Sequence, residues 1–148
     1  MQFFSKAVLD TEGHVQNVIM IPAAILYVDD DPDDLTFLKE AFEEQFYSSA
    51  LYFDSALSLL SHLYSIKEDT LLPKLIITDI NMPKMTGIEL LTIIKNNIRL
   101  KHIKVIVLST AYKQDYDIQC KKLGAVNFIQ KPSSFAEMKE LVTYFLYQ

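Results

Sequence analysis

The stretch ILYVDDDPDD, residues 25–34, joins an apolar run directly to five aspartates that only Pro32 interrupts. Crowded carboxylates repel one another and resist ionising together, so a site of this kind usually holds a cation. The apolar run is typical of a buried strand, and Asp31 followed by Pro32 is typical of a helix N-terminus. The stretch therefore predicts a strand, an acidic site at its end and a helix beyond it.

Short apolar runs of the same kind recur along the chain and alternate with longer segments of helical period, which is the pattern of βα units. The predicted strands are Ala24 to Val28, Ala50 to Phe53, Leu75 to Thr78, Val105 to Leu108 and Val126 to Ile129. Right-handed crossovers between them give an α/β fold, a doubly wound parallel sheet with helices on both faces.

The intervening segments carry apolar stripes at helical spacing, which we interpret as core-facing positions. The stripes are Leu35, Leu38 and Phe42; Ile88, Leu91, Ile94 and Ile98; and Phe135, Met138, Leu141, Val142 and Phe145. Start signals agree with these helices. Asp31 can cap the first helix, Asp54 or Ser55 the second, and Thr86 with Glu89 can form a capping box for the third.

Composition bounds the class of protein. The 148 residues, half of them hydrophobic, fit one domain, and the net charge of −5 argues against a surface that grips nucleic acid. The single cysteine, Cys120, is expected to be a packed thiol. The chain carries neither an apolar run of membrane-spanning length nor the pattern of a signal peptide, so we expect a soluble cytoplasmic protein that makes no membrane contact.

The first 22 residues stand outside the βα pattern. We interpret residues 1–22 as an N-terminal extension that need not be native structure, with residues 23–148 as the domain. Met20, just before the first strand, is an alternative start of the native chain.

Ligands of doubly wound sheets bind beyond the carboxyl ends of the strands. Three carboxylates, a hydroxyl and an ammonium follow four of the predicted strands. They belong to Asp29, Asp30, Asp79, Ser109 and Lys131. A single strand-end aspartate is usually a helix cap, and a single lysine is usually solvated, but their joint occurrence at corresponding strand ends indicates a site.

The blocks ILYVDDDPDD, LIITDINMPKMTGIELL, VIVLSTA and FIQKP together resemble the receiver domains of response regulators, the chemotaxis-type phosphoacceptor family. The resemblance runs from about residue 23 to the end of the chain. It implies a flavodoxin-like fold with five parallel strands in the order 2-1-3-4-5. It also implies a stand-alone regulator that catalyses only its own phosphorylation and dephosphorylation.

By this resemblance Asp79 is the phosphorylated residue, and Lys131 and Ser109 assist it. The metal ligands are Asp29, Asp30, Asp79 and the backbone carbonyl of Asn81. The switch residues are Ser109 and Phe128, where Phe128 replaces the tyrosine common in the family. The family also implies a cis peptide bond before Pro132, and we expect Ser133 and Ser134 to cap the last helix.

The chemistry favours Mg²⁺, with Mn²⁺ as a substitute, because a hard divalent cation neutralises both the carboxylate and the phosphoryl oxygens. Asp31, Asp33 and Asp34 are assigned the plainer role of favouring a helix N-terminus. The expected donor is a histidine kinase or a histidine phosphotransfer protein. The expected output is a downstream protein or a self-dimer, with no direct DNA binding.

We expect this output on the face formed by the helix near residues 112–122, the strand Val126 to Ile129 and the last helix. Inward rotation of Phe128 would remodel that face. The candidate contact residues are Tyr112, Tyr116, Lys121, Lys122 and Tyr144.

Two alternatives stay open. A Mg²⁺-dependent phosphatase of the haloacid-dehalogenase type also uses a strand-end aspartate, but its second acid follows two residues later, where this chain has Asn81. A degenerate receiver that acts only as a binding module would be expected to lack the phosphorylated aspartate, the acidic pair or the lysine, and this chain has all of them. An FMN-binding flavodoxin is disfavoured, because no phosphate loop follows the first strand.

Overall fold

The computed structural model describes residues 3–47 and 49–148 and contains a five-stranded parallel sheet in the order β4-β3-β5-β6-β7. The strands are Ile25–Val28 (β3), Ala50–Phe53 (β4), Leu75–Asp79 (β5), Lys104–Ser109 (β6) and Asn127–Gln130 (β7). Numbered from β3, this is the order 2-1-3-4-5, so the predicted fold is confirmed. Each predicted strand is found within one residue of its expected bounds.

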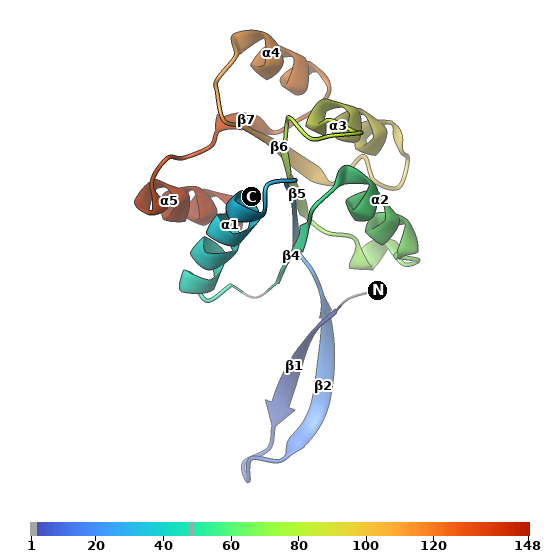
Figure 1. Ribbon diagram of the computed structural model, residues 1–148. Coiled ribbons are helices and arrows are strands. Elements are labelled where there is room, and N and C mark those ends of the chain that lie inside the picture. The colour runs from blue at the N-terminus through green and yellow to red at the C-terminus, as the bar shows by residue number, and fades with distance from the viewer. Residues whose placement is uncertain (1–2, 48) are drawn as a thin grey trace.

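The helices lie on both faces of the sheet (Figure 1). They are Pro32–Glu44 (α1), Ala56–Ser65 (α2), Gly87–Asn96 (α3), Gln114–Lys122 (α4) and Phe135–Leu146 (α5), with a short 3-10 turn at Asp69–Leu71 (η1). Helices α1 and α5 pack on one face, around Phe42 and Phe145. Helices α2, α3 and α4 cover the other face, around Leu59 and Leu91.

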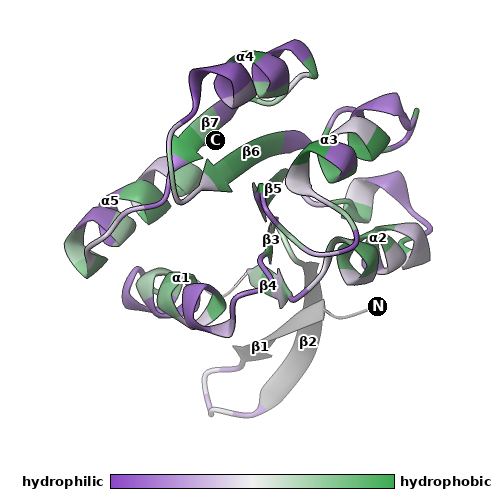
Figure 2. Cartoon of the chain, turned by 45° about the horizontal axis from the view of Figure 1, so that its top comes forward, coloured by the Kyte–Doolittle hydropathy of each residue, from purple (hydrophilic) through white to green (hydrophobic). Residues whose placement is uncertain are grey.

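Hydrophobic side chains concentrate on the strands and the inner helix faces. Figure 2 shows the central strands mainly in green and purple stretches along the helices. All four residues of β3 and all five of β5 are buried, as expected for central parallel strands. None of the described helices is both long and apolar enough to cross a membrane.

The predicted helix caps are confirmed. The side chains of Asp31, Ser55, Thr86 and Ser134 each accept a backbone N–H in the first turn of α1, α2, α3 and α5, and Thr86 forms the capping box with Glu89. The prediction that Ile98 faces the core is wrong. Helix α3 ends at Asn96, and the Asn97 side chain accepts the next backbone N–H groups, which leaves Ile98 80% exposed.

The N-terminal residues form an antiparallel hairpin of Phe3–Leu9 (β1) and Val15–Pro22 (β2), which extends away from the domain (Figure 1). Its turn is closed by the Asp10 carboxylate, which accepts the N–H groups of Glu12 and His14, and Gly13 supplies the positive φ. The hairpin is a separate two-stranded sheet. The interpretation of residues 1–22 as a non-native extension stays a prediction.

Candidate functional site

Strands β3 and β5 bring three carboxylates together. The two strands pair in parallel, with Val28 opposite Thr78, so the residues that follow these positions meet at the same edge of the sheet. Oxygens of Asp29, Asp30 and Asp79 all lie within 4.8 Å of one another. Asp29 and Asp79 are buried and Asp30 is exposed, so the group opens to solvent on one side.

Lys131, directly after β7, reaches this acidic group. Its Nζ atom lies 2.6 Å from Asp29 Oδ2, 2.6 Å from Asp34 Oδ2 and 2.9 Å from Asp79 Oδ1, and its side chain is only 8% exposed. Its backbone N–H donates to the Ser109 carbonyl at 2.7 Å, which fixes the start of this loop against β6. The structure therefore unites the predicted lysine with the predicted aspartates.

The predicted cis peptide bond before Pro132 is wrong. In the described part of the chain no peptide bond is cis. Lys131 makes its three carboxylate contacts with the bond in the trans form, which X-Pro bonds favour by about 0.5–1 kcal/mol.

Burial and charge act in opposite directions at these groups. Burial raises the pKa of Asp79, and the nearby Asp29 carboxylate raises it further, while the hydrogen bond from Lys131 lowers it; the net direction is upward. For Lys131, burial lowers the pKa, but hydrogen bonds to Asp29, Asp34 and Asp79 outweigh it, so the ammonium stays charged. One ammonium thus faces four carboxylates, counting Asp30, which leaves the site negative.

The donor set suits a hard divalent cation. Such ions take oxygen ligands, and Mg²⁺ typically binds one or two carboxylates and keeps several waters. Asp29, Asp30 and Asp79 present carboxylate oxygens at the required proximity. Asn81 lies two residues beyond Asp79 and is exposed, and the role of its backbone carbonyl stays a prediction.

Ser109 and Phe128 lie at the expected positions, at the end of β6 and within β7, but Phe128 does not have the outward starting position that the expected switch requires. The Ser109 hydroxyl donates to the Ala111 carbonyl at 2.8 Å, within its own loop. The Phe128 ring is only 4% exposed and packs edge-on against Tyr112, with ring centroids 6.0 Å apart. Inward rotation of Phe128 needs an outward starting position, and the structure already has this ring inside the core.

Tyr27 and Asp34 are site residues that the sequence reasoning missed. The buried Tyr27 hydroxyl donates to Asp29 Oδ2 at 2.6 Å. A hydroxyl two residues before Asp29, in an otherwise aliphatic strand, was the available signal, because alternate strand residues share a face. Asp34 was assigned only to the helix terminus, yet its carboxylate contacts Lys131.

Gly87, at the start of α3, was also missed. A Cβ atom there would lie 2.2 Å from the backbone oxygen of Asp79, and the Gly87 N–H donates to the Ile80 carbonyl at 2.9 Å. Glycine therefore permits the loop after Asp79 to fold back against the end of β5. Cys120, by contrast, is a packed thiol as predicted: it is buried, and burial raises its pKa to about 11.

The family model described as the response regulator receiver domain matches residues 25–143. The chain is 30% identical over 118 residues to the chemotaxis protein CheY of Pseudomonas aeruginosa, which covers 80% of this chain and 91% of that protein. Three other curated relatives are longer, and the chain spans 29%, 35% and 32% of their lengths.

Two solved structures have the same arrangement. The Mn²⁺-bound form of the response regulator Rcp1 is 27% identical, with a TM-score of 0.71 over 84% of this chain and 95% of that one. The phosphorylated cyanobacterial phytochrome response regulator RcpA is 26% identical, with a TM-score of 0.71 over 84% of this chain and 91% of that one.

Proposed function

Because the chain belongs to the response regulator receiver domain family, we propose that it is a phosphoacceptor of a two-component or phosphorelay system in which Asp79 receives the phosphoryl group. The observation that carries the proposal is the position of Lys131 Nζ, 2.9 Å from Asp79 Oδ1 and beside the acidic pair. Modules of this family act in signalling.

The transfer is a displacement at phosphorus. An oxygen of the Asp79 carboxylate forms the new O–P bond, the N–P bond of a donor phosphohistidine breaks, and its electron pair stays on the imidazole. With acetyl phosphate as donor, the leaving group is acetate. Lys131 donates to a phosphoryl oxygen, and its buried position excludes water from one side of the group.

A divalent cation held by Asp29, Asp30 and Asp79, with Asn81 as a further ligand, supplies charge neutralisation for the phosphoryl oxygens. Three features support this assignment. The three carboxylates converge, the site is negative, and the similar protein Rcp1 has a Mn²⁺-bound form. We propose Mg²⁺ as the resident ion.

The signal leaves the site through Ser109. Its hydroxyl bonds to the Ala111 carbonyl, and donation to a phosphoryl oxygen would break that contact. The same loop carries Tyr112, whose ring packs on Phe128 and whose hydroxyl donates to Asp117 of α4 at 2.7 Å. Phosphorylation would thus alter the loop that links β6 to α4, in which Tyr112 contacts the buried Phe128.

The partner-binding face is proposed to be that of α4, β7 and α5. Tyr112, Ile118 and Val126 are large exposed hydrophobic residues on or beside it. We propose a histidine kinase or histidine phosphotransfer protein as the donor. A downstream protein, or a second copy of this chain, is the proposed receiver of the signal.

The test is uptake of label from acetyl phosphate with Mg²⁺, followed by mass mapping of the acyl phosphate. Asp79→Asn should abolish uptake, because the nucleophile is removed. The matched control is Asp33→Asn, which makes the same change of charge at an exposed position of α1 and should keep uptake. Undiminished labelling of Asp79→Asn would refute the assignment, and turnover of small phosphate esters by the wild type would favour the phosphatase alternative.

A further inference from the structure

The Lys131 ammonium is already engaged by three carboxylates in this structure: it donates hydrogen bonds to Asp29 and Asp34 and forms a close ion pair with Asp79. An ammonium has three donors, and the three nearest acceptors are carboxylate oxygens of Asp29, Asp34 and Asp79 at 2.6, 2.6 and 2.9 Å. The oxygens of a phosphoryl group on Asp79 lie beyond the carboxylate oxygen that Lys131 now contacts, so a bond to them replaces the Asp79 contact and competes with the contacts to Asp29 and Asp34.

The three carboxylates differ in how readily they can lose the lysine. Asp29 is 1% exposed and is held by the Tyr27 hydroxyl at 2.6 Å and the Asp31 N–H at 3.0 Å. Asp79 carries the phosphoryl group itself. Asp34 has a side chain that is 35% exposed, and within the described residues its carboxylate has no other hydrogen-bond partner.

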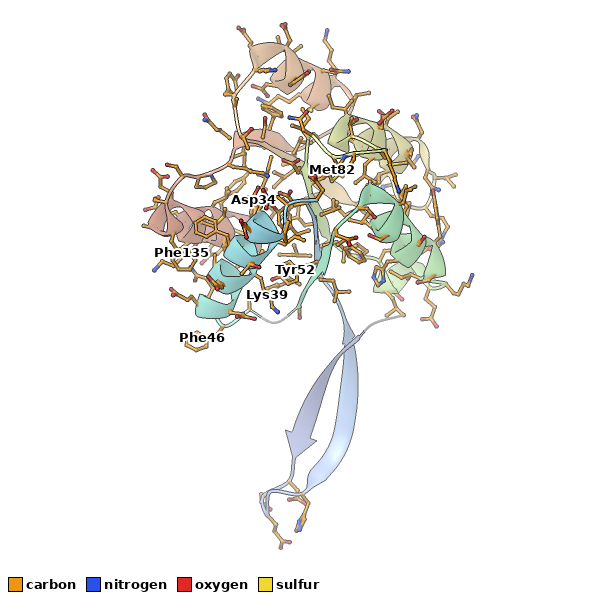
Figure 3. The ribbon with its side chains drawn as sticks, viewed as in Figure 1. Asp34, Lys39, Phe46, Tyr52, Met82 and Phe135 are labelled. Carbon is orange, nitrogen blue, oxygen red and sulfur yellow. The ribbon has the colours of Figure 1, made fainter. Side chains whose placement is uncertain are left out.

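Of the three carboxylates, Asp34 can therefore lose its contact with the lysine most easily, because water can replace that contact. A buried carboxylate left unpaired is far more unfavourable than an exposed one. It lies in the first turn of α1, at the rim of the site (Figure 3), where the positive end of the helix dipole also favours an unpaired anion. The neighbouring Asp33 is exposed in the same turn and makes no contact with Lys131.

We infer that Asp34 is a positioning residue that holds the Lys131 ammonium in the unphosphorylated protein and releases it to the phosphoryl group on Asp79. This inference rests on the proposed function, and it adds a competitor to the site. Asp34 keeps the lysine buried and directed at Asp79, and the same contact breaks when the phosphoryl group arrives. The strength of the Asp34 contact therefore sets how readily the phosphorylated state forms.

The first measurement is the affinity for beryllofluoride, a phosphoryl mimic that attaches to the acceptor aspartate, at a Mg²⁺ concentration that saturates each variant. Asp34→Asn should bind beryllofluoride roughly three- to tenfold more tightly than the wild type, because a charged hydrogen bond no longer has to break. Asp33→Asn is the matched control for the loss of one negative charge from the same helix turn. General damage to the site would weaken the binding of beryllofluoride. An increase in affinity therefore distinguishes the positioning role from a purely structural role of Asp34.

The second measurement needs no phosphoryl mimic. The ¹⁵N signal of the Lys131 ammonium in the free protein should shift and exchange faster with water in Asp34→Asn, and should stay as in the wild type in Asp33→Asn. An unshifted signal in Asp34→Asn would overturn the inference.

The two experiments also separate this inference from the proposed function. Binding by Asp34→Asn that is no tighter than that of Asp33→Asn would overturn the inference and leave the proposed function standing. A wild type that binds no beryllofluoride at all would overturn the proposed function, and with it the release step of the inference. The ammonium signal would then still decide whether Asp34 holds the lysine.

Discussion

Helices α1 and α4 both follow strands that carry site residues, yet they are held in different ways. Helix α1 begins with the Asp31 cap and Pro32, and it buries Leu38, Ala41 and Phe42 against the sheet and α5. Helix α4 follows Lys113, which makes no side-chain cap, and Cys120 is its single buried residue.

This difference suggests different roles for the two helices: α1 fixes the site residues, and α4 transmits the state of the site. The α1 end of the site carries Asp34 and is anchored in the core, so its carboxylates keep their positions. Helix α4 packs on the core through Cys120, with Tyr116 and Leu123 partly buried beside it. Its side-chain link to the preceding loop is the Tyr112–Asp117 hydrogen bond. Segments with few buried contacts open at low free energy, which suits an element that must move when a signal arrives.

The largest expected contrast is in core truncation. Phe42 is fully buried and stacks near Phe145, with ring centroids 6.5 Å apart, so Phe42→Ala should lower the free energy of unfolding by about 3–5 kcal/mol. Ile118 on α4 is 45% exposed, and Ile118→Ala should change the free energy of unfolding by about 0.5 kcal/mol or less. Urea unfolding of both variants measures the difference, and similar losses would contradict the comparison.

A smaller contrast is expected at the helix caps. Asp31→Ala removes the acceptor for the Asp33 N–H and should lower the free energy of unfolding by about 1 kcal/mol. Lys113 already has the extended backbone of a cap, at φ −132° and ψ 119°, so Lys113→Asp should raise it by about 0.5–1 kcal/mol. Thermal or urea unfolding tests both, and a destabilised Lys113→Asp would mean that α4 is limited by something other than its cap.

The smallest expected effect concerns pH. Hydrogen bonds from Lys121 and Tyr112 hold the pKa of Asp117 below its ordinary value. The contribution of this cluster is therefore present above the ordinary aspartate value of about 3.9 and is lost as the pH falls through the lower, folded-state pKa. Exposed pairs are also screened by salt.

The measurement is amide-exchange protection, corrected for intrinsic rates, at pH 5 and pH 3. On going from pH 5 to pH 3, protection in α4 should fall more than protection in α1. At pH 5, 1 M salt should lower the protection of α4 and so reduce its fall between the two pH values. In Asp117→Asn the pH response of α4 should disappear. Equal losses in both helices would show that the Asp117 cluster does not hold α4.

Much of this protein follows from local sequence. Strand positions, four helix caps and the strand-end residues were predictable, because burial of apolar runs and capping of backbone groups depend on near neighbours. The error at Ile98 has the same origin: its spacing continued the stripe of α3, but the Asn97 side chain ended the helix first.

The sequence by itself determined which residues reach the site edge: Asp29, Asp30 and Lys131 follow strands, Asp79 ends one, and parallel strands end together. Only the tertiary structure decided their partners. The contact between Asp34 and Lys131, which are 97 positions apart in the sequence, depends on how separate elements pack. The same holds for the trans bond at Pro132 and the buried position of Phe128. Contacts between distant residues are fixed by the sum of that packing, which no local pattern contains.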